Sequence, residues 1–206
     1  MTRLINCLLA LGALLSACNR RNETIRALEA DGCHVEYFDS GCAYVDLYGL
    51  WLDDLRSEKL TAMVTKLAKE DVCMLGLRSC AEDEHLKIVA RSSKLWGLDL
   101  TATNVTAQGL RELTRLKLST LYLVNCPNVD DKAIKAIAPI RTLKLLHIEG
   151  THVSDKSIPI LGTFTDLDRL FVSAPITEEG AARLRKLLPN TKVHGRHLSR
   201  AAESSQ

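Results

Sequence analysis

The sequence predicts an α/β fold in which short parallel strands and helices alternate along the chain. A triplet of apolar residues with the spacing L-x-x-L-x-L recurs five times, at steps of 23 to 25 residues. From the second triplet on, each is followed by an apolar loop residue, then a Thr, Asp or Ser, and then apolar residues at helical spacing. Only 4% of the residues are aromatic, so the core must be aliphatic. No unit can bury its own apolar face, and we therefore expect stacked units around one continuous core.

Each apolar triplet is predicted to contain a short strand, because residues two apart in a strand point to the same face of a sheet. The central and last residues of each triplet are two apart and should point into the core together. The triplets are Val72-Leu75-Leu77, Leu95-Leu98-Leu100, Leu118-Leu121-Leu123, Leu143-Leu146-Ile148 and Leu167-Leu170-Val172.

A helix start is predicted shortly after each of the last four triplets. Thr, Asp and Ser accept hydrogen bonds from the backbone N–H groups of a first helical turn. The expected capping residues are Thr106, Asp130, Ser154 and Thr177, each directly after an inward Val105, Val129, Val153 or Ile176. The expected inward helix residues are Leu110, Leu113, Leu116, Ile134, Ile137, Ile158 and Leu161.

The two ends are expected to cap the stack. "ETIRALEADG" predicts an amphipathic helix with Ile25 and Leu28 facing inward, and "HVEYF" and "CAYVDLYG" predict a hairpin around residues 39–41. "SEKLTAMVTKLAKE" predicts a helix that leads into the first triplet. At the other end, Val193 lies 23 residues after Leu170, which favours a last short strand.

The units "LWGLDLTATNVTAQGLREL" and "LLHIEGTHVSDKSIPIL" resemble those of bacterial leucine-rich-repeat proteins, and "LPNTKV" resembles the usual ending of that family. The resemblance covers residues 43–195 and implies a right-handed solenoid with a short parallel sheet on its concave side and helices on its convex side. It implies an interaction scaffold and supplies no catalytic residues. We also expect no metal and no cofactor. The first unit departs from the family, because "CAEDEHLKIVA" stands where the "V-T-D" element belongs.

The N-terminus has the pattern of a lipoprotein signal peptide. Arg3 precedes an apolar run from Leu4 to Leu15, which is too short to span a bilayer as a mature helix. Leu15-Ser16-Ala17-Cys18 matches the lipobox of bacterial lipoproteins, which implies cleavage before Cys18 and its lipidation. An ordinary secretory signal is the alternative. Asn19 at the next position favours the outer membrane under the usual sorting rule, and otherwise a periplasm-facing membrane surface.

The expected organisation is a signal peptide, a short tether, a cap, the repeat domain and a polar tail. These segments span residues 1–17, 18–24, 25–42, 43–195 and 196–206. Five cysteines remain after the signal peptide and Cys18 are set aside, so they cannot all pair. Cys33 and Cys42 flank the hairpin and could form a disulfide, whereas Cys80 and Cys126 are interpreted as structural.

The stretch "LLHIEGTHVSD" contains His147, Glu149 and His152, residue types that also occur in the motifs of zinc enzymes. The repeat places His147 and Glu149 on the exposed strand face but His152 in the following loop. The helical His-Glu-x-x-His zinc motif depends on a one-turn spacing that puts both histidines on one face, and the spacing here is different. We therefore interpret these residues as solvated polar positions and expect no metal ion and no catalytic residue here.

The most informative surface is the exposed face of the predicted sheet. Tyr122, His147 and Phe171 occupy one column on consecutive strands, and aromatic residues in such a place are enriched at interfaces. Solvated strand residues are the alternative, because aromatics are also good strand formers. The patch is expected to be flanked by the charged side chains of Asp99, Arg78 and Glu149.

The sequence favours a membrane-anchored, non-catalytic scaffold in the cell envelope that binds a protein or glycan through this face. Its 27 basic and 25 acidic side chains leave a net charge of +2, which argues against nucleic acid as a partner. The first alternative is a metal-dependent or hydrolase-like enzyme that uses His147 and Glu149. The second is a purely structural envelope lipoprotein.

Overall fold

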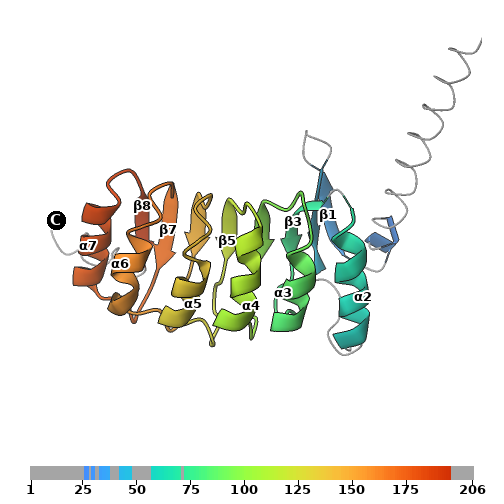
Figure 1. Cartoon of the computed structure of the whole chain (residues 1–206), viewed down its shortest axis with the longest axis horizontal. Helices are drawn as coiled ribbons and strands as arrows, with labels where there is room; N and C mark the ends of the chain where they lie inside the picture. Colours follow the sequence, from blue (N-terminus) through green and yellow to red (C-terminus); the bar gives the residue numbers. More distant parts are fainter. Residues whose placement is uncertain are drawn as a thin grey trace, which may run out of the picture.

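The computed structural model describes residues 26–27, 29–30, 33–37, 42–47, 57–70 and 72–195. They form an α/β fold built on one open sheet of eight strands, whose order in space is their order along the chain (Figure 1). The first two strands pair antiparallel, and every later neighbouring pair is parallel. The predicted α/β class and the parallel sheet are therefore confirmed.

The strands are three to five residues long. They are β1 His34–Tyr37, β2 Ala43–Asp46, β3 Val72–Gly76, β4 Gly97–Asp99, β5 Thr120–Tyr122, β6 Leu145–His147, β7 Arg169–Val172 and β8 Lys192–Gly195. The helices between them are α2 Ser57–Leu67, α3 Asp83–Val89, α4 Ala107–Glu112, α5 Asp131–Ile137, α6 Ile158–Leu161 and α7 Glu178–Leu187, with the 3-10 turns η3 Leu113–Arg115 and η4 Asp155–Ser157.

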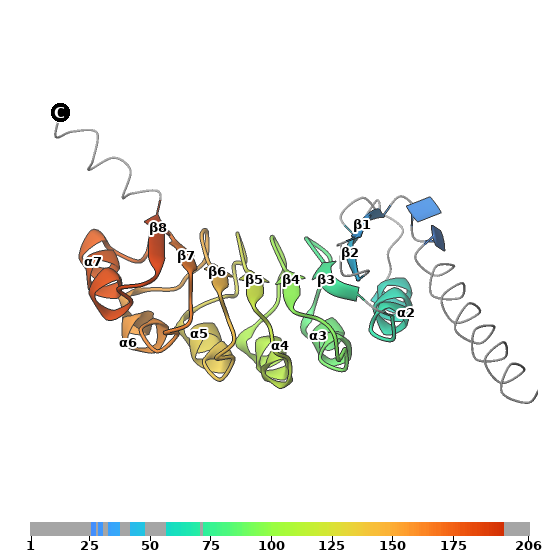
Figure 2. The ribbon, with the colours of Figure 1, turned by 90° about the horizontal axis from the view of Figure 1, so that it is seen from above.

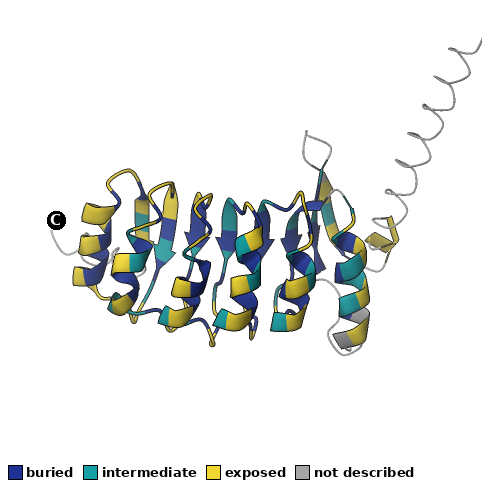
Figure 3. Ribbon diagram, in the orientation of Figure 1, coloured by how far each residue is buried: buried dark blue, intermediate teal, exposed yellow. Residues whose placement is uncertain are grey.

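The helices between consecutive strands all lie on the same side of the sheet (Figure 2). We call this the helix side, and the opposite surface of the sheet the open sheet face. The core fills the space between the strands and the helices, where the inward residues of both are dark blue in Figure 3.

The strand register follows the predicted repeat. The central residues of the five triplets pair directly with one another across β3 to β7, and the row continues at both ends. In order, the row is Val45, Leu75, Leu98, Leu121, Leu146, Leu170 and Val193. Leu121 and Leu146 are fully buried, as expected for core residues. Burying one such side chain contributes about 1.5–3 kcal/mol, so this row supplies much of the stability of the stack.

All four predicted capping residues begin a helical turn. The Thr106 side chain accepts a hydrogen bond from Gln108, Asp130 from Lys132 and Ala133, Ser154 from Lys156, and Thr177 from Gly180. The apolar residue before each cap is at most 2% exposed. Local capping chemistry and inward anchoring thus fix the point where each turn of the chain leaves the sheet.

An aspartate at the first helical position also ties three units to the next one. The Asp131 carboxylate accepts hydrogen bonds from the backbone N–H of Ser154 at 2.9 Å and from its hydroxyl at 2.7 Å. Asp83 and Asp155 accept the same two bonds from Thr106 and Thr177. These acids therefore act between units, a role beyond the helix-dipole role that their position suggests.

The first unit lacks the "V-T-D" element, and its helix begins with a different set of hydrogen bonds. Helix α3 begins at Asp83, and the backbone N–H of Glu82 donates to Nδ1 of His85 at 3.0 Å. The His85 ring is buried at the base of the helix. A side chain within the first turn thus binds the backbone ahead of the helix, where the other units use a hydroxyl or carboxylate at the capping position.

The predicted N-terminal hairpin is present, since His34 pairs with Asp46 and Tyr37 with Ala43. The predicted helix "SEKLTAMVTKLAKE" is also confirmed as α2. Several expectations fall outside the described residues: the signal peptide with Cys18, the inward role of Ile25 and Leu28, and the polar tail.

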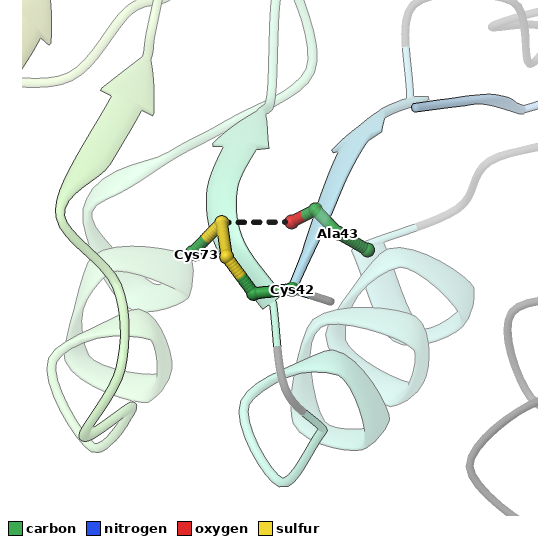
Figure 4. The surroundings of a disulfide bond; sticks show 3 residues. All are labelled: Cys42, Ala43 and Cys73. Carbon is green, nitrogen blue, oxygen red and sulfur yellow. Dashed lines mark hydrogen bonds between the residues drawn. A yellow bond between two sulfur atoms is a disulfide. The ribbon is translucent and has the colours of Figure 1, made fainter. Parts of the chain in front are cut away.

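The disulfide between Cys33 and Cys42, which the sequence left open, is not formed. Cys42 forms its disulfide with Cys73, and their Cα atoms are 5.8 Å apart (Figure 4). The parallel pairing of β2 with β3 brings Ala43 opposite Val72, so residues 42 and 73 meet across the two strands. The sulfur of Cys73 also lies 3.5 Å from the Ala43 carbonyl oxygen. A disulfide sulfur carries no proton, so this is a close contact and not a hydrogen bond.

Candidate functional site

The registers align one column of outward residues across the open sheet face. Each member follows the buried central residue of its strand and therefore points to the opposite side. In order along the sheet, the column contains Asp46, Gly76, Asp99, Tyr122, His147, Phe171 and His194. Its first half is polar and small, and its second half consists of rings.

Four rings form a continuous ladder over β5 to β8, which we call the ring ladder: Tyr122, His147, Phe171 and His194. The centroids of His147 and Phe171 are 4.6 Å apart with planes 30° apart, and those of Phe171 and His194 are 4.7 Å apart at 15°. Tyr122 is tilted against His147 at 6.0 Å. The spacings of the two stacked pairs match the distance between neighbouring strands, about 4.8 Å. Each inner ring is therefore covered on its faces and presents its edge outward.

His147 and Glu149 form a close pair beside this ladder. Nε2 of His147 lies 2.7 Å from Oε2 of Glu149, and the two side chains are only 20% and 19% exposed. The expectation of solvated positions is therefore wrong for both, because the neighbouring rings and the pairing itself cover them. The pair fixes the orientation of the His147 ring within the ladder.

His152 does not join that pair. It lies in the loop after β6, is exposed, and its Nδ1 is 2.6 Å from the carbonyl oxygen of Pro127. A carbonyl only accepts, so Nδ1 carries the proton of this bond. Within the described ranges, no group of three or more His, Cys, Asp or Glu side chains is arranged to hold a metal ion.

The polar half of the column is buried, which corrects the prediction that Asp99 is part of an exposed rim. Asp99 is 4% exposed, and Asp46 is 6% exposed. Nε of Arg78 donates to Asp99 at 2.6 Å, and its terminal nitrogen lies 3.7 Å from Asp46. Arg78 is therefore half-buried over two carboxylates and covers them, and its charge is largely neutralised.

Tyr44 completes this network by donating its hydroxyl to Asp46 at 2.9 Å. Burial, together with the bond to Asp46 and its charge, raises the pKa of Tyr44 well above its usual value. Gly76 makes the arrangement possible, since a Cβ there would lie 2.5 Å from the Asp46 carboxylate. The network joins β2 to β3 and β4. It covers this half of the open sheet face with polar groups that are hydrogen-bonded to one another.

The thiols of Cys80 and Cys126 are not activated for chemistry. Sγ of Cys126 donates to the Leu100 carbonyl at 3.0 Å, and burial raises the pKa of this thiol. Burial, followed by the charge of Asp46, raises the pKa of Cys80 to about 11. Nucleophilic cysteines need a lowered pKa, so both thiols are protonated at neutral pH.

The sequence analysis missed two residues of the site, His194 and Tyr44. The position of His194 could have been predicted, because Val193 continues the central row of buried residues and the residue after it must continue the outward column. Tyr44 was also predictable, because its partner Asp46 lies two residues away on the same strand and shares its face, whereas the approach of Arg78 to Asp46 depends on how β2 pairs with β3. The sequence correctly brought Tyr122, His147 and Phe171 together and correctly placed Glu149 beside them.

No protein-family model matches the sequence, and no curated protein is significantly similar to it. Across the residues described above, no helix has both the length and the apolar character needed to cross a membrane.

Proposed function

We propose that this chain is a leucine-rich-repeat solenoid, a non-catalytic scaffold that binds a protein or glycan through the concave surface of its sheet. The ring ladder is the observation that carries this proposal. Tyr122, His147 and Phe171 are half-buried and His194 is exposed, so the four rings offer a preformed, ordered surface. Rings locked by their neighbours lose little conformational freedom on binding.

The chemistry of the ladder fits an interface centre. Aromatic residues are over-represented among the side chains that dominate binding energy. The ladder combines apolar ring edges with polar atoms of Tyr122, His194 and Glu149 at its margin. The network of Arg78 and Asp99 lies next to the ladder and adds rigidity. At the other end of the ladder, Arg169 and Lys192 supply an exposed charged rim, because they precede Phe171 and His194 by two residues on the same strands.

The His147–Glu149 pair is the one observation that favours an enzyme, because a carboxylate that orients a histidine recurs in catalytic sites. A nucleophile or substrate proton must then lie within about 2.6–3.2 Å of that histidine. Nε2 of His147 is already bonded to Glu149, and the ring faces are stacked. The hydroxyl of Ser173, two residues after Phe171, accepts a hydrogen bond from the backbone N–H of Gly150 and donates one to the carbonyl of Ala174. We therefore favour a structural role for the pair.

Capture from a cell-envelope extract tests the binding proposal. The full chain with Tyr122→Ala and Phe171→Ala should keep its fold but bind its partner about 1–2 kcal/mol more weakly, because truncation removes the centre of the surface. The matched control carries Arg183→Ala and Lys186→Ala on the helix side and should bind normally. Loss of capture in the control alone would place the binding surface on the helices. No captured partner for any form would favour the purely structural alternative.

We further propose that the chain is a lipoprotein of the cell envelope, anchored through Cys18 in the outer membrane or in a periplasm-facing membrane surface. The lipobox Leu15-Ser16-Ala17-Cys18 supports this location. The disulfide between Cys42 and Cys73 supports it independently, since disulfides persist in oxidising compartments and are rare in the cytosol.

Replacing the anchor residue tests this location. Cys18→Ser should abolish labelling by a fatty-acid probe and move the chain into the soluble envelope fraction, because lipid chains supply the anchoring energy. Cys126→Ser, a cysteine of the core, serves as the control and should stay labelled and membrane-bound. A native chain without any label would refute lipidation at Cys18.

A further inference from the structure

A groove of about 470 Å³ runs between α4 and α5 on the helix side. Ala107 and Arg111 line one wall, one helical turn apart, and Lys132, Lys135 and Ala136 line the other. Thr114 and Pro139 complete the lining. The lining therefore combines the small side chains of Ala107 and Ala136 with three long, exposed basic side chains.

The three basic side chains of the groove are not held in ion pairs within the described residues. Arg111, Lys132 and Lys135 are exposed, and none of them makes an ion pair with another residue in the part of the chain that the structure describes. Lys132 and Lys135 are three residues apart on one helix, where like charges repel. No acidic residue lines the groove. An anion in the groove would relieve this repulsion.

The nearby acids are already engaged elsewhere. Asp130 caps α5, and Asp131 is bound to Ser154 and Ser157 of the next unit. Glu112 lies 3.8 Å from Arg115. Residues 100–144 contain seven basic and three acidic side chains, an excess of four positive charges in a chain whose net charge is only +2. This excess lies in the segment that contains α4 and α5, and three of its seven basic residues line the groove.

We propose that the α4–α5 groove binds the phosphate headgroup of an anionic phospholipid. A lone phosphate would fill a small part of the groove, whereas a headgroup with its glycerol portion matches both the volume and the lining. The cations would face the phosphate, and Ala107, Ala136 and Pro139 would contact the uncharged part. Basic side chains near a membrane surface are attracted to its anionic lipids.

Headgroup binding at this site would orient the molecule. Helices α4 and α5, whose residues line the groove, lie on one side of the sheet (Figure 2), whereas the ring ladder belongs to the opposite face. Contact through α4 and α5 would hold the helix side against the membrane and turn the open sheet face away from it, toward partners. This inference does not depend on lipidation of Cys18, which would tether the chain without setting its orientation.

Vesicle sedimentation with the full chain tests the proposal. The chain should bind phosphatidylcholine vesicles that contain phosphatidylglycerol much more tightly than vesicles of phosphatidylcholine alone, and added salt should weaken this preference. The variant Arg111→Gln/Lys132→Gln/Lys135→Gln should lose the preference by about a hundredfold, at roughly fivefold per charge. The N-terminal apolar segment is the same in every form and cancels in this comparison.

The matched control carries Arg183→Gln/Arg185→Gln/Lys186→Gln on α7, which removes the same charge from exposed positions. It should lose less than tenfold. Equal losses in the two variants would overturn the groove as a site and leave only net charge. Circular dichroism should show the same fold and thermal midpoint for both.

Titration with inorganic phosphate separates a lipid headgroup from a soluble anion. Phosphate at the concentration of the vesicle phosphatidylglycerol should displace little of the bound protein. Tight binding of phosphate that the groove variant abolishes, together with equal binding to the two kinds of vesicle, would overturn the lipid proposal in favour of a soluble anion.

Discussion

At the scale of single residues, the fold depends on strict alternation between neighbours along each strand. Leu146 is fully buried in the core, while His147 points to the open sheet face and belongs to the ring ladder. A shift of one residue in register would exchange these two environments. Adjacent residues of one strand therefore report on the register directly.

Truncation of these two neighbours should have clearly different costs. Leu146→Ala should lower the free energy of unfolding by about 2–5 kcal/mol, through lost burial and the cavity left behind. His147→Ala should lower it by about 1 kcal/mol, because it removes ring stacking and the bond to Glu149 but leaves the core intact. Urea unfolding of both variants measures the difference. Equal costs would show that the strand register is wrong.

The inward residues were predictable because a two-residue period and a repeat of 23 to 25 residues are local properties of the sequence. The state of Asp99 was not, since its burial depends on Arg78 one strand away and on Asp46 two strands away. The lack of a side chain at Gly76 also contributes. Such contacts join residues whose proximity only the assembled sheet defines, and the same reason explains why the partner of Cys42 was missed.

At the scale of elements, the helix starts hold neighbouring units together through aspartate. Burial raises the pKa of Asp131, but the hydrogen bonds from Ser157 and Ser154 outweigh it and hold the pKa below its usual value. The charged carboxylate is therefore the form that the folded chain favours. Capping residues could be predicted from local sequence, whereas these bonds reach the next unit and could not.

Asp131→Asn should lower the free energy of unfolding by about 1–2 kcal/mol at neutral pH, because the neutral amide accepts these bonds more weakly. A lowered pKa adds stability above the unfolded-state value near pH 4, and this stability is lost as the pH falls through the folded-state pKa. The stability of the variant should thus depend less on pH below about 4. Chemical unfolding across this range provides the measurement.

The exposed Asp168 offers a matched control, because its side chain makes no bond like those of Asp131 among the residues described. Asp168→Asn should change stability by less than about 0.5 kcal/mol. If the free energy of unfolding of Asp131→Asn fell as much as that of the wild type when the pH was lowered below about 4, the aspartate would not couple the units energetically.

At the scale of the whole molecule, the sheet and the helices present two surfaces of different chemistry. The open sheet face carries the ring ladder and a closed polar network, and the helix side carries exposed charge around the α4–α5 groove. The sequence predicted the sheet face as the place of binding because the repeat aligns Tyr122, His147 and Phe171. The groove was not predicted, since it depends on how two helices from different units pack together.

The central claim is that a partner docks on the ring ladder. Site-specific photo-crosslinking tests it most directly, with benzoylphenylalanine placed at Phe171 in one form of the full chain and at Lys156, an exposed residue of the helix side, in another. After irradiation in envelope extract, the form labelled at Phe171 should give one discrete adduct, and the form labelled at Lys156 should not give it. An adduct from Lys156 with none from Phe171 would contradict the account.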